Sequence, residues 1–336
     1  MIRQGNHVVI SSRDIPQMAQ CVSYINSEHI TSMTVAANGG ERISLSFFEG
    51  IYNEKIKKVM CAGVGNIDSL QATPWIEELV LTPKNGEVLD VGVFSNLCRL
   101  DTDNIQSFIN RDKLNLLHFG TGIPNFDFTE LLPYTQLESL LFYGVKTFSF
   151  DKIKCFTKLK EINARVLTIT DLRGIEKLEE LQGLSLLYCR ILSDLSGIGT
   201  LRKLTGMLLA NCPKVTDISE IAKCVNLEEL ELNSLKNIDV SVLSNANNLG
   251  KLMLSNCGSV SSLRFISLMT NLEFLSFVDT NIIDGDLSPC LNLKYVGTLN
   301  KKHYNIKADM LPNQKTRFHP QRAEIENPIE IIFSAN

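Results

Sequence analysis

Residues 227–235 of the chain are LEELELNSL, with apolar residues at the first, fourth and sixth positions. The same spacing returns in four neighbouring stretches, which begin at Leu181 (LQGLSLLYC), Leu204 (LTGMLLANC), Leu249 (LGKLMLSNC) and Leu272 (LEFLSFVDT). The shared template is L-x-x-L-x-L-x-x-[N/C], where L stands for any apolar residue. A template that recurs at a fixed interval predicts a repeat architecture.

The repeat extends in both directions from this stretch. Further matches begin at Leu159, Leu137, Leu114 and Ile76, weaker ones at Leu97 and Ile56, and a last one at Leu293. From Leu114 onward the successive starts are 23, 22, 22, 23, 23, 22, 23 and 21 residues apart. Chance does not keep such a period through nine starts, so these residues predict one stacked structure.

Each repeat has two sets of apolar residues. The alternation in L-x-x-L-x-L fits a short strand with one buried face. A second set lies between the strands, as in Val215-Thr216-Asp217-Ile218, where we expect the aspartate to cap a short helical turn. One repeat cannot bury its own apolar side, so the repeats must stack and pair their strands in parallel. The expected fold is an α/β solenoid with a curved parallel sheet on the concave side and short helical or irregular turns on the convex side.

The stretch VTDISEIAKCVNLEELEL, residues 215–232, resembles leucine-rich repeats of the short, roughly 22-residue class. That class is found in internalin-like bacterial proteins and in phosphatase-regulating proteins. The resemblance covers about residues 56–300 and implies a leucine-rich repeat solenoid of about 11–12 repeats. Several repeats lack the usual asparagine at the ninth position, which Cys189, Cys212 and Cys257 occupy instead. We expect these cysteines to be buried thiols that face the backbone.

Non-repetitive segments flank the solenoid. Residues 1–55 break the period and are expected to form an N-terminal cap, with strands in HVVISS, ITSMTVAAN and RISLSFFEG and a helix over Ile15 to Ile25. Residues 301–336 are expected to form a C-terminal cap or tail, whose apolar run Pro328 to Phe333 folds back as a strand. Such caps cover the apolar core at the ends of a solenoid. A small separate functional domain at the N-terminus is the alternative.

Composition and charge exclude several classes of partner. The 336 residues include 33 basic and 37 acidic side chains, a net charge of -4, so the basic excess of a non-specific nucleic-acid binder is missing. No window approaches the ~20 apolar residues of a membrane span, and the N-terminus has no signal-peptide core. The nine cysteines are odd in number and form no C-x-x-C pair, which argues against a disulfide framework or a zinc site. We expect a cytoplasmic protein with reduced thiols.

Catalytic motifs are missing from the sequence. The five histidines are dispersed, and H-E-x-x-H, G-x-S-x-G and G-x-x-x-x-G-K-[ST] do not occur. We therefore expect no enzymatic activity, no cofactor, no metal site and no small-molecule substrate.

The template also predicts a binding surface. Its third, fifth and seventh positions point away from the core, toward the concave side. Apolar side chains occupy several of these positions, namely Leu141, Tyr143, Leu187, Leu208, Met253 and Phe274. Charged residues flank them, namely Glu161, Arg165, Glu229, Glu231 and Lys251. Contiguous exposed apolar surface with a polar rim is typical of an interaction site; the alternative is that these apolar residues only pack on each other across neighbouring strands.

The functional hypothesis is a non-catalytic protein-binding module that uses the concave face. One form of it is a bacterial inhibitor or immunity-type protein that occupies a toxin or enzyme partner. The alternative is an adaptor or regulatory subunit that targets an enzyme such as a phosphatase. The repeat motif itself indicates fold and does not name the partner.

Overall fold

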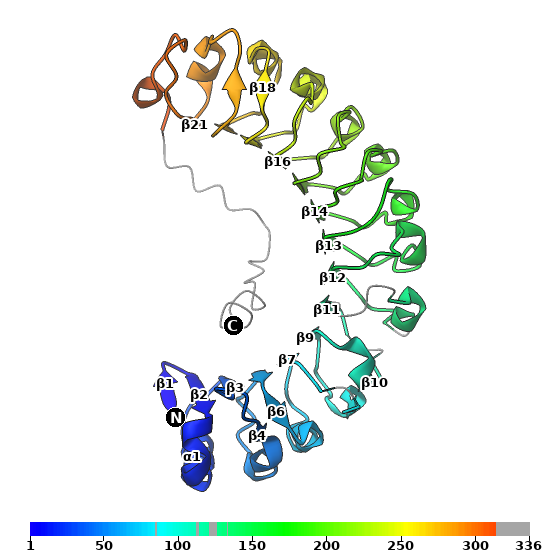
Figure 1. The fold of residues 1–336 in the computed structure, drawn as a ribbon, viewed down its shortest axis with the longest axis vertical. Helices are drawn as coiled ribbons and strands as arrows, with labels where there is room; N and C mark the ends of the chain where they lie inside the picture. Colours follow the sequence, from blue (N-terminus) through cyan, green and yellow to red (C-terminus); the bar gives the residue numbers. More distant parts are fainter. Residues whose placement is uncertain (85, 112–113, 121–125, 133, 314–336) are drawn as a thin grey trace. The chain divides into compact units, whose positions relative to one another are not determined.

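The computed structural model describes residues 1–84, 86–111, 114–120, 126–132 and 134–313. The chain divides into two compact units. Unit one includes Met1–Arg111, and unit two includes Asp112–Gln314. Both contain one strand per repeat followed by a short helical turn (Figure 1).

Unit one contains a sheet that is parallel except for its first strand. Its strands, in spatial order, are β1 (Ile2–Gln4), β2 (His7–Ser11), β3 (Ser32–Ala36), β5 (Lys58–Ala62), β7 (Glu78–Leu81) and β9 (Arg99–Thr102). β1 is antiparallel to β2, and each later pair is parallel. Two small parallel ladders join β4 (Ile43–Ser44) to β6 (Val64–Gly65) and β8 (Leu89–Asp90) to β10 (Phe108–Ile109).

The helical segments of unit one include one α-helix, α1 (Met18–Ser27). The 3-10 turns are η1 (Ser12–Gln17), η2 (Leu45–Gly50), η3 (Ile67–Ala72), η4 (Val91–Val93) and η5 (Ile105–Ser107). The helix expected over Ile15 to Ile25 is therefore present as η1 followed by α1. Cys21 and Ile25 of α1 are buried, so the helix packs one face on the sheet as a repeat turn would.

Residues 1–55 already contain two strands of the parallel sheet. β2, β3 and β5 begin at His7, Ser32 and Lys58, which are 25 and 26 residues apart. These intervals are longer than those after Leu114: the first contains α1 in place of the short turn, and the second contains the six-residue turn η2. The strand expected in RISLSFFEG is wrong beyond Ser44: the segment continues as η2, which buries Leu45 and Phe48.

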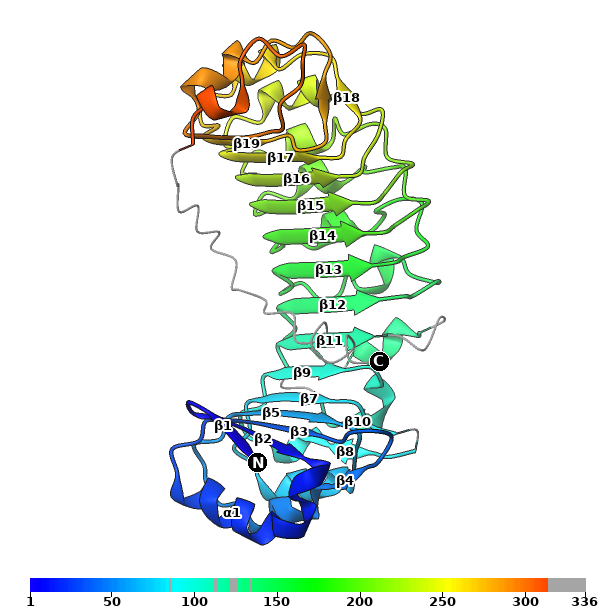
Figure 2. The same cartoon turned by 60° about the vertical axis from the view of Figure 1, so that its left-hand side comes forward.

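Unit two contains a fully parallel sheet. Its strands, in order, are β11 (Leu116–Gly120), β12 (Ser139–Tyr143), β13 (Glu161–Arg165), β14 (Gly183–Leu187), β15 (Gly206–Ala210), β16 (Glu229–Asn233), β17 (Lys251–Ser255), β19 (Phe274–Ser276) and β21 (Tyr295–Gly297). Each strand pairs with the next without a register shift, so residues at the same template position lie side by side (Figure 2). One small ladder joins β18 (Ser259–Val260) to β20 (Asn281–Ile282).

The core of unit two lies between this sheet and the return turns. Leu184 and Leu186 of β14 point inward and are buried, as their counterparts in the neighbouring strands are. The turns run along the convex side (Figure 1) and are η6 (Phe128–Leu131), η7 (Phe150–Lys152), η8 (Ile175–Lys177), η9 (Ile198–Thr200), η10 (Ile221–Lys223), η11 (Val240–Asn245), η12 (Arg264–Leu268) and η13 (Ser288–Asn292). Each adds buried anchors such as Ile198 and Ile221. Stacking between repeats is what covers this core, in agreement with the predicted solenoid.

The ninth template position is buried and bonds to the backbone. The thiol of Cys212 lies 3.4 Å from the carbonyl oxygen of Ala210, and the thiol of Cys257 lies 3.2 Å from that of Leu232. Thr280 occupies the same position in the next repeat and donates to the Leu254 carbonyl oxygen at 2.6 Å. The expectation of buried thiols that face the backbone is confirmed.

The eighth template position adopts the left-handed conformation in seven consecutive repeats of unit two. The residues are Gly144, Val166, Tyr188, Asn211, Ser234, Asn256 and Asp279, with φ between 52° and 77°. The turn that leaves each strand requires this conformation, which glycine and asparagine adopt readily. A β-branched residue such as Val166 is strained there.

The C-terminal end of unit two is covered by the chain that follows β21. Tyr304 is buried and its hydroxyl accepts a hydrogen bond from the Ile282 amide at 3.2 Å, while Asn305 accepts one from the Leu287 amide at 2.8 Å. The turn η14 (Ala308–Met310) precedes the buried Leu311. The apolar run from Pro328 to Phe333, expected to fold back as a strand, lies outside the described residues.

The strain at the eighth position predicts opposite effects for two reciprocal substitutions. Val166→Asn should raise the free energy of unfolding by about 1 kcal/mol, because asparagine tolerates the left-handed region and valine does not. Asn211→Val should lower it by a similar amount. Chemical denaturation of the two variants beside the parent chain measures both. If the two changes have the same sign, backbone strain does not govern this position.

Candidate functional site

The candidate site is the outward-facing side of the sheet in unit two. Side chains alternate along a strand, so residues next to the buried Leu184 and Leu186 point away from the core. In β14 these are Gly183, Ser185 and Leu187, at the third, fifth and seventh template positions. The strands line the inner side of the arc that this unit forms, so these residues lie on its concave face (Figure 1).

The register arranges this face into three rows that cross the strands. The third-position row is Ser139, Glu161, Gly183, Gly206, Glu229, Lys251, Phe274 and Tyr295. The fifth-position row is His118, Leu141, Asn163, Ser185, Leu208, Glu231, Met253 and Ser276. The seventh-position row is Tyr143, Arg165, Leu187, Ala210, Asn233 and Ser255.

The structure brings the predicted site residues onto this one face. Ten of them are half-buried, which leaves part of each side chain open to a partner: Tyr143, Glu161, Arg165, Leu187, Leu208, Glu229, Glu231, Lys251, Met253 and Phe274. Leu141 is the exception, because only 3% of its surface is exposed. It lies in register between His118 and Asn163, and a bulky side chain in a row spaced by ~4.8 Å packs on its neighbours. The expectation that Leu141 offers free apolar surface is wrong.

Small residues occupy the face where β14 and β15 lie side by side. Gly183 and Gly206 lie side by side and carry no side chain, and Ser185 and Ala210 are small and buried. A Cβ atom placed on Gly183 would lie 3.6 Å from the Glu161 side chain, which is an ordinary contact, so the Glu161 side chain lies over this glycine. Packing therefore does not require glycine at this position.

Charged and aromatic side chains form one end of the third-position row. The Lys251 ammonium lies 3.5 Å from the Glu229 carboxylate and 5.5 Å from the centre of the Phe274 ring. Phe274 in turn stacks on Tyr295, with ring centres 4.4 Å apart and planes 10° from parallel. Phe274 therefore packs on a residue of the neighbouring strand and is still partly exposed to solvent.

Tyr295 is a residue of this face that was not among the predicted site residues. It occupies the third position of the last repeat, LKYVGTLNK, whose weak match to the template hid its place in the row. The signal that could have found it is the 21-residue step from Leu272 to Leu293, which keeps the period and places Tyr295 beside Phe274.

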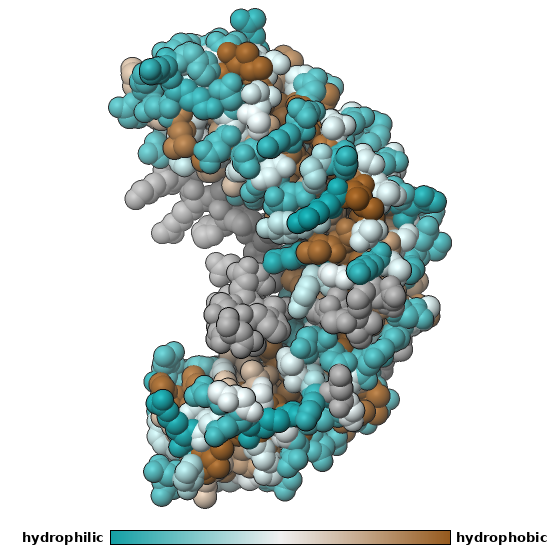
Figure 3. Space-filling view, viewed as in Figure 1, coloured by the Kyte–Doolittle hydropathy of each residue, from teal (hydrophilic) through white to brown (hydrophobic). Residues whose placement is uncertain are grey.

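Apolar side chains also gather on the flank of unit two. The space-filling view shows brown side chains beside β13 and β14, on the flank where the strands end, between teal ones (Figure 3). None of the predicted site residues lies on this flank.

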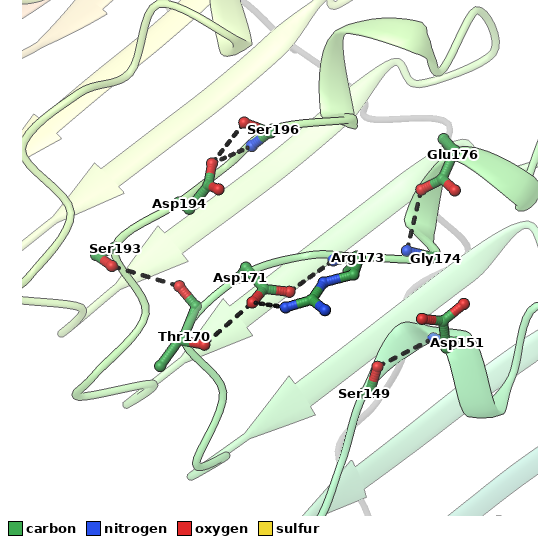
Figure 4. A network of polar contacts seen from close by, with 10 residues as sticks. All are labelled: Ser149, Asp151, Thr170, Asp171, Arg173, Gly174, Glu176, Ser193, Asp194 and Ser196. Atoms are coloured by element: carbon green, nitrogen blue, oxygen red, sulfur yellow. Dashed lines mark hydrogen bonds and ion pairs between the residues drawn. The ribbon is translucent and has the colours of Figure 1, made fainter.

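The aspartates of the convex turns accept hydrogen bonds from backbone amides of the same turns. Asp171, Asp194 and Asp217 accept hydrogen bonds from the amides of Arg173, Ser196 and Ser219, at 3.1, 2.8 and 2.8 Å; the first two turns are drawn in Figure 4. Asp239 caps η11 in the same way. The sequence expectation that these aspartates cap short turns is confirmed.

Hydrogen bonds at these turns lower the pKa of the carboxyl groups. The Ser219 amide holds the pKa of Asp217 below its usual value, and the side chain and amide of Arg173 do so for Asp171. These carboxylates are thus charged and engaged with their own turns, which is a structural role.

Metal and membrane sites receive no support from the described part of the chain. Among those residues, no group of three or more histidine, cysteine, aspartate or glutamate side chains could hold a metal ion. No helix formed by the described residues has the length and apolar character needed to cross a bilayer.

Comparison with known proteins rests on structure. No protein-family model matches the chain, and no curated protein is similar to it in sequence. An internalin from Listeria monocytogenes matches with a TM-score of 0.53 and 18% sequence identity, over 80% of this chain and 86% of the internalin. The chain has the leucine-rich repeat fold. This confirms the resemblance that residues 215–232 indicated.

A second match is a chain in the Toll–Spatzle complex from Drosophila, with a TM-score of 0.55 and 16% identity. The match covers 89% of this chain and 52% of the other, so this chain spans about half of the length of the protein that it matches. At these identities the likeness concerns the fold, and the binding residues of the concave face stay a prediction.

The turn aspartates predict how stability depends on pH. The pKa of Asp217 is lower in the folded chain than in the unfolded chain, so its ionised carboxylate stabilises the fold. This contribution to stability is complete above the ordinary aspartate pKa of about 3.9. It is lost as the pH falls through the lower pKa of the folded state. Asp217→Asn removes the titration. We expect the melting temperatures of parent and variant to converge as the pH falls from 5 to 2.

The control is Asp309→Asn, which makes the same change in charge at an exposed residue. Its melting temperature should keep a constant difference from the parent across this pH range. A constant difference for Asp217→Asn as well would contradict the assigned role of its carboxylate.

Proposed function

We propose that this leucine-rich repeat protein is a non-catalytic binding module that holds another protein on the concave face of unit two. The observation that carries the proposal is the set of half-exposed apolar residues on that face, above all Leu187, Leu208 and Met253. Charged residues of both signs lie in the same and neighbouring strands, namely Arg165, Glu231 and Lys251. Apolar contact area with a charged surround is the usual composition of a protein interface.

The shape of the face favours a macromolecular partner. The three rows cross consecutive strands of one sheet, so the surface is broad and shallow. Half-buried side chains at fixed spacing are well suited to contact a folded partner, because little side-chain freedom remains to be lost on binding.

The finer form of the proposal is an inhibitor or immunity-type protein that blocks the activity of the protein it captures. A solenoid sheet can cover a wide area of an enzyme surface, which supports inhibition by occlusion. An adaptor would instead leave the activity of the captured enzyme intact.

The binding proposal predicts the behaviour of a double variant. Leu208→Ser with Met253→Ser should weaken capture of the native partner at least tenfold, since truncating central apolar contacts typically costs more than about 1 kcal/mol each. The measurement is quantitative affinity capture from the host, with mass spectrometry, followed by titration of the captured protein. Its activity with and without the parent chain then separates an inhibitor from an adaptor.

The matched control is Val225→Ser with Leu268→Ser. These residues are 49% and 66% exposed and lie outside the concave face. The control should capture the same protein as the parent chain. If the concave-face variant captures it equally well, the partner does not bind there.

We also infer that the protein works in a reducing compartment, the cytoplasm. All nine cysteines are free thiols, and seven are buried. Burial raises the pKa of the Cys224 and Cys290 thiols to about 12, which keeps them protonated and unreactive.

This inference predicts a thiol count. Protein isolated from its host without reductant should yield nine titratable thiols after denaturation. Before denaturation the exposed Cys155 should react first, and the buried thiols should stay protected. Fewer than nine thiols in the denatured protein would place it in an oxidising compartment instead.

A further inference from the structure

The flank of unit two at which the strands end has its own regular backbone. We call it the strand-end rim and define it as the four residues after each of β12 to β16, namely 144–147, 166–169, 188–191, 211–214 and 234–237. The ladder of hydrogen bonds continues into it, because the amides of Val166, Tyr188 and Asn211 donate to the next strand at 2.8, 2.8 and 2.9 Å. The rim is therefore as firmly ordered in register as the sheet.

The rim carries charge of a single sign. Its twenty residues include Lys146, Arg190, Lys214 and Lys236 and no aspartate or glutamate, a net charge of +4 in a chain of net charge -4. All four basic side chains are exposed, and none forms an ion pair with a described residue. Like charges on stacked repeats repel each other, so nothing within the fold accounts for their placement.

The opposite flank, where the strands begin, is arranged differently. There Lys160 pairs with Glu138 at 2.9 Å, and Lys203 pairs with Glu180 at 2.6 Å. Each of these pairs links two adjacent repeats. The carboxylates that follow the rim in sequence, such as Asp171 and Asp217, are engaged with the backbone of the convex turns. These carboxylates keep their charge but, within the described part of the chain, form no ion pair with the basic side chains of the rim, which can therefore pair with an external acidic group.

Apolar side chains are interleaved with these charges. Val166, Tyr188 and Ile191 are 54%, 45% and 42% exposed, and Figure 3 shows brown side chains among teal ones on this flank. Val166 and Tyr188 also hold the left-handed conformation, with φ of 56° and 58°. The left-handed conformation costs a non-glycine residue about 1–2 kcal/mol of conformational free energy.

Exposure and strain thus coincide at the same two residues. Other repeats place Gly144, Asn211 and Asn256 at this position, so residues that avoid both costs are compatible with the fold. Strained residues that the core does not require, with exposed apolar side chains, are characteristic of binding sites.

We propose that the strand-end rim is a second docking surface, which binds an acidic polypeptide segment that carries apolar side chains. Carboxylates of the segment would pair with Lys146, Arg190, Lys214 and Lys236, and its apolar side chains would cover Val166, Tyr188 and Ile191. A polypeptide fits better than a nucleic acid, because valine and isoleucine offer nothing to a phosphate backbone and the rim has one aromatic residue for stacking. This surface shares no residue with the concave face on which the proposed function rests, although it adjoins that face at Arg165 and Leu187.

The test is selection of peptides from a phage-displayed library of random 12-residue sequences on the full chain. We expect enriched peptides to combine net negative charge with apolar residues. A synthetic copy of the best peptide should bind the variant Arg190→Glu with Lys214→Glu at least tenfold more weakly than the parent. The control variant Lys177→Glu with Arg202→Glu makes the same charge change at exposed residues outside the rim and should bind normally.

Val166→Asn gives a readout that a purely structural role would not produce. It should weaken peptide binding while raising the melting temperature, because it removes an exposed apolar contact and relieves strain at once. The concave-face variant Leu208→Ser with Met253→Ser should keep peptide binding, which separates failure of this proposal from failure of the proposed function.

Several outcomes would overturn the rim assignment. One is a set of peptides without net negative charge, or no enrichment at all. Another is equal binding to the rim and control variants. Binding of a 20-nucleotide single-stranded DNA that depends on Arg190 and Lys214 would assign the rim to nucleic acid. A dimer in sedimentation that the same variant abolishes would assign it to a second copy of the chain.

Discussion

The structure depends on one constraint: a repeat cannot bury its own apolar side, so it must stack on its neighbours. Stacking without a register shift satisfies the backbone groups of every strand through the next strand and closes the core between sheet and turn. It also places equivalent positions side by side. Every property of the surface follows from that placement, because a residue type chosen at one template position becomes a row that crosses the sheet.

The rows explain how small sequence choices produce different surfaces on one scaffold. In the third-position row, two consecutive glycines are followed by charged and then by aromatic side chains. On the strand-end flank, the fold requires a left-handed turn but no particular side chain. The convex side is different, since its aspartates bind the amides of their own turns and are not available to a partner.

Much of this arrangement could be predicted from the sequence, for definite reasons. The period after Leu114 is set by the core, so the strands, their register and the outward positions followed from it. The strands of residues 1–55 were harder to assign to the sheet, because their spacing is longer and valine, isoleucine and methionine replace leucine at the inward positions. Burial of Leu141 depends on its row neighbours, which a single repeat does not show. The rim escaped notice because its significance lies in backbone conformation and missing carboxylates, neither of which has a motif.

The left-handed turn has a consequence for how such a chain can change over time. At the inward positions a new side chain alters the packing of three repeats at once, and selection removes most such changes. At the eighth position the side chain leaves the core, and Gly, Asn, Ser, Asp, Val and Tyr all occur there in one molecule. A mutation at this point alters what the flank presents while the stack stays intact. The protein can therefore acquire or exchange recognition properties one repeat at a time, without passing through unfolded intermediates in its evolution.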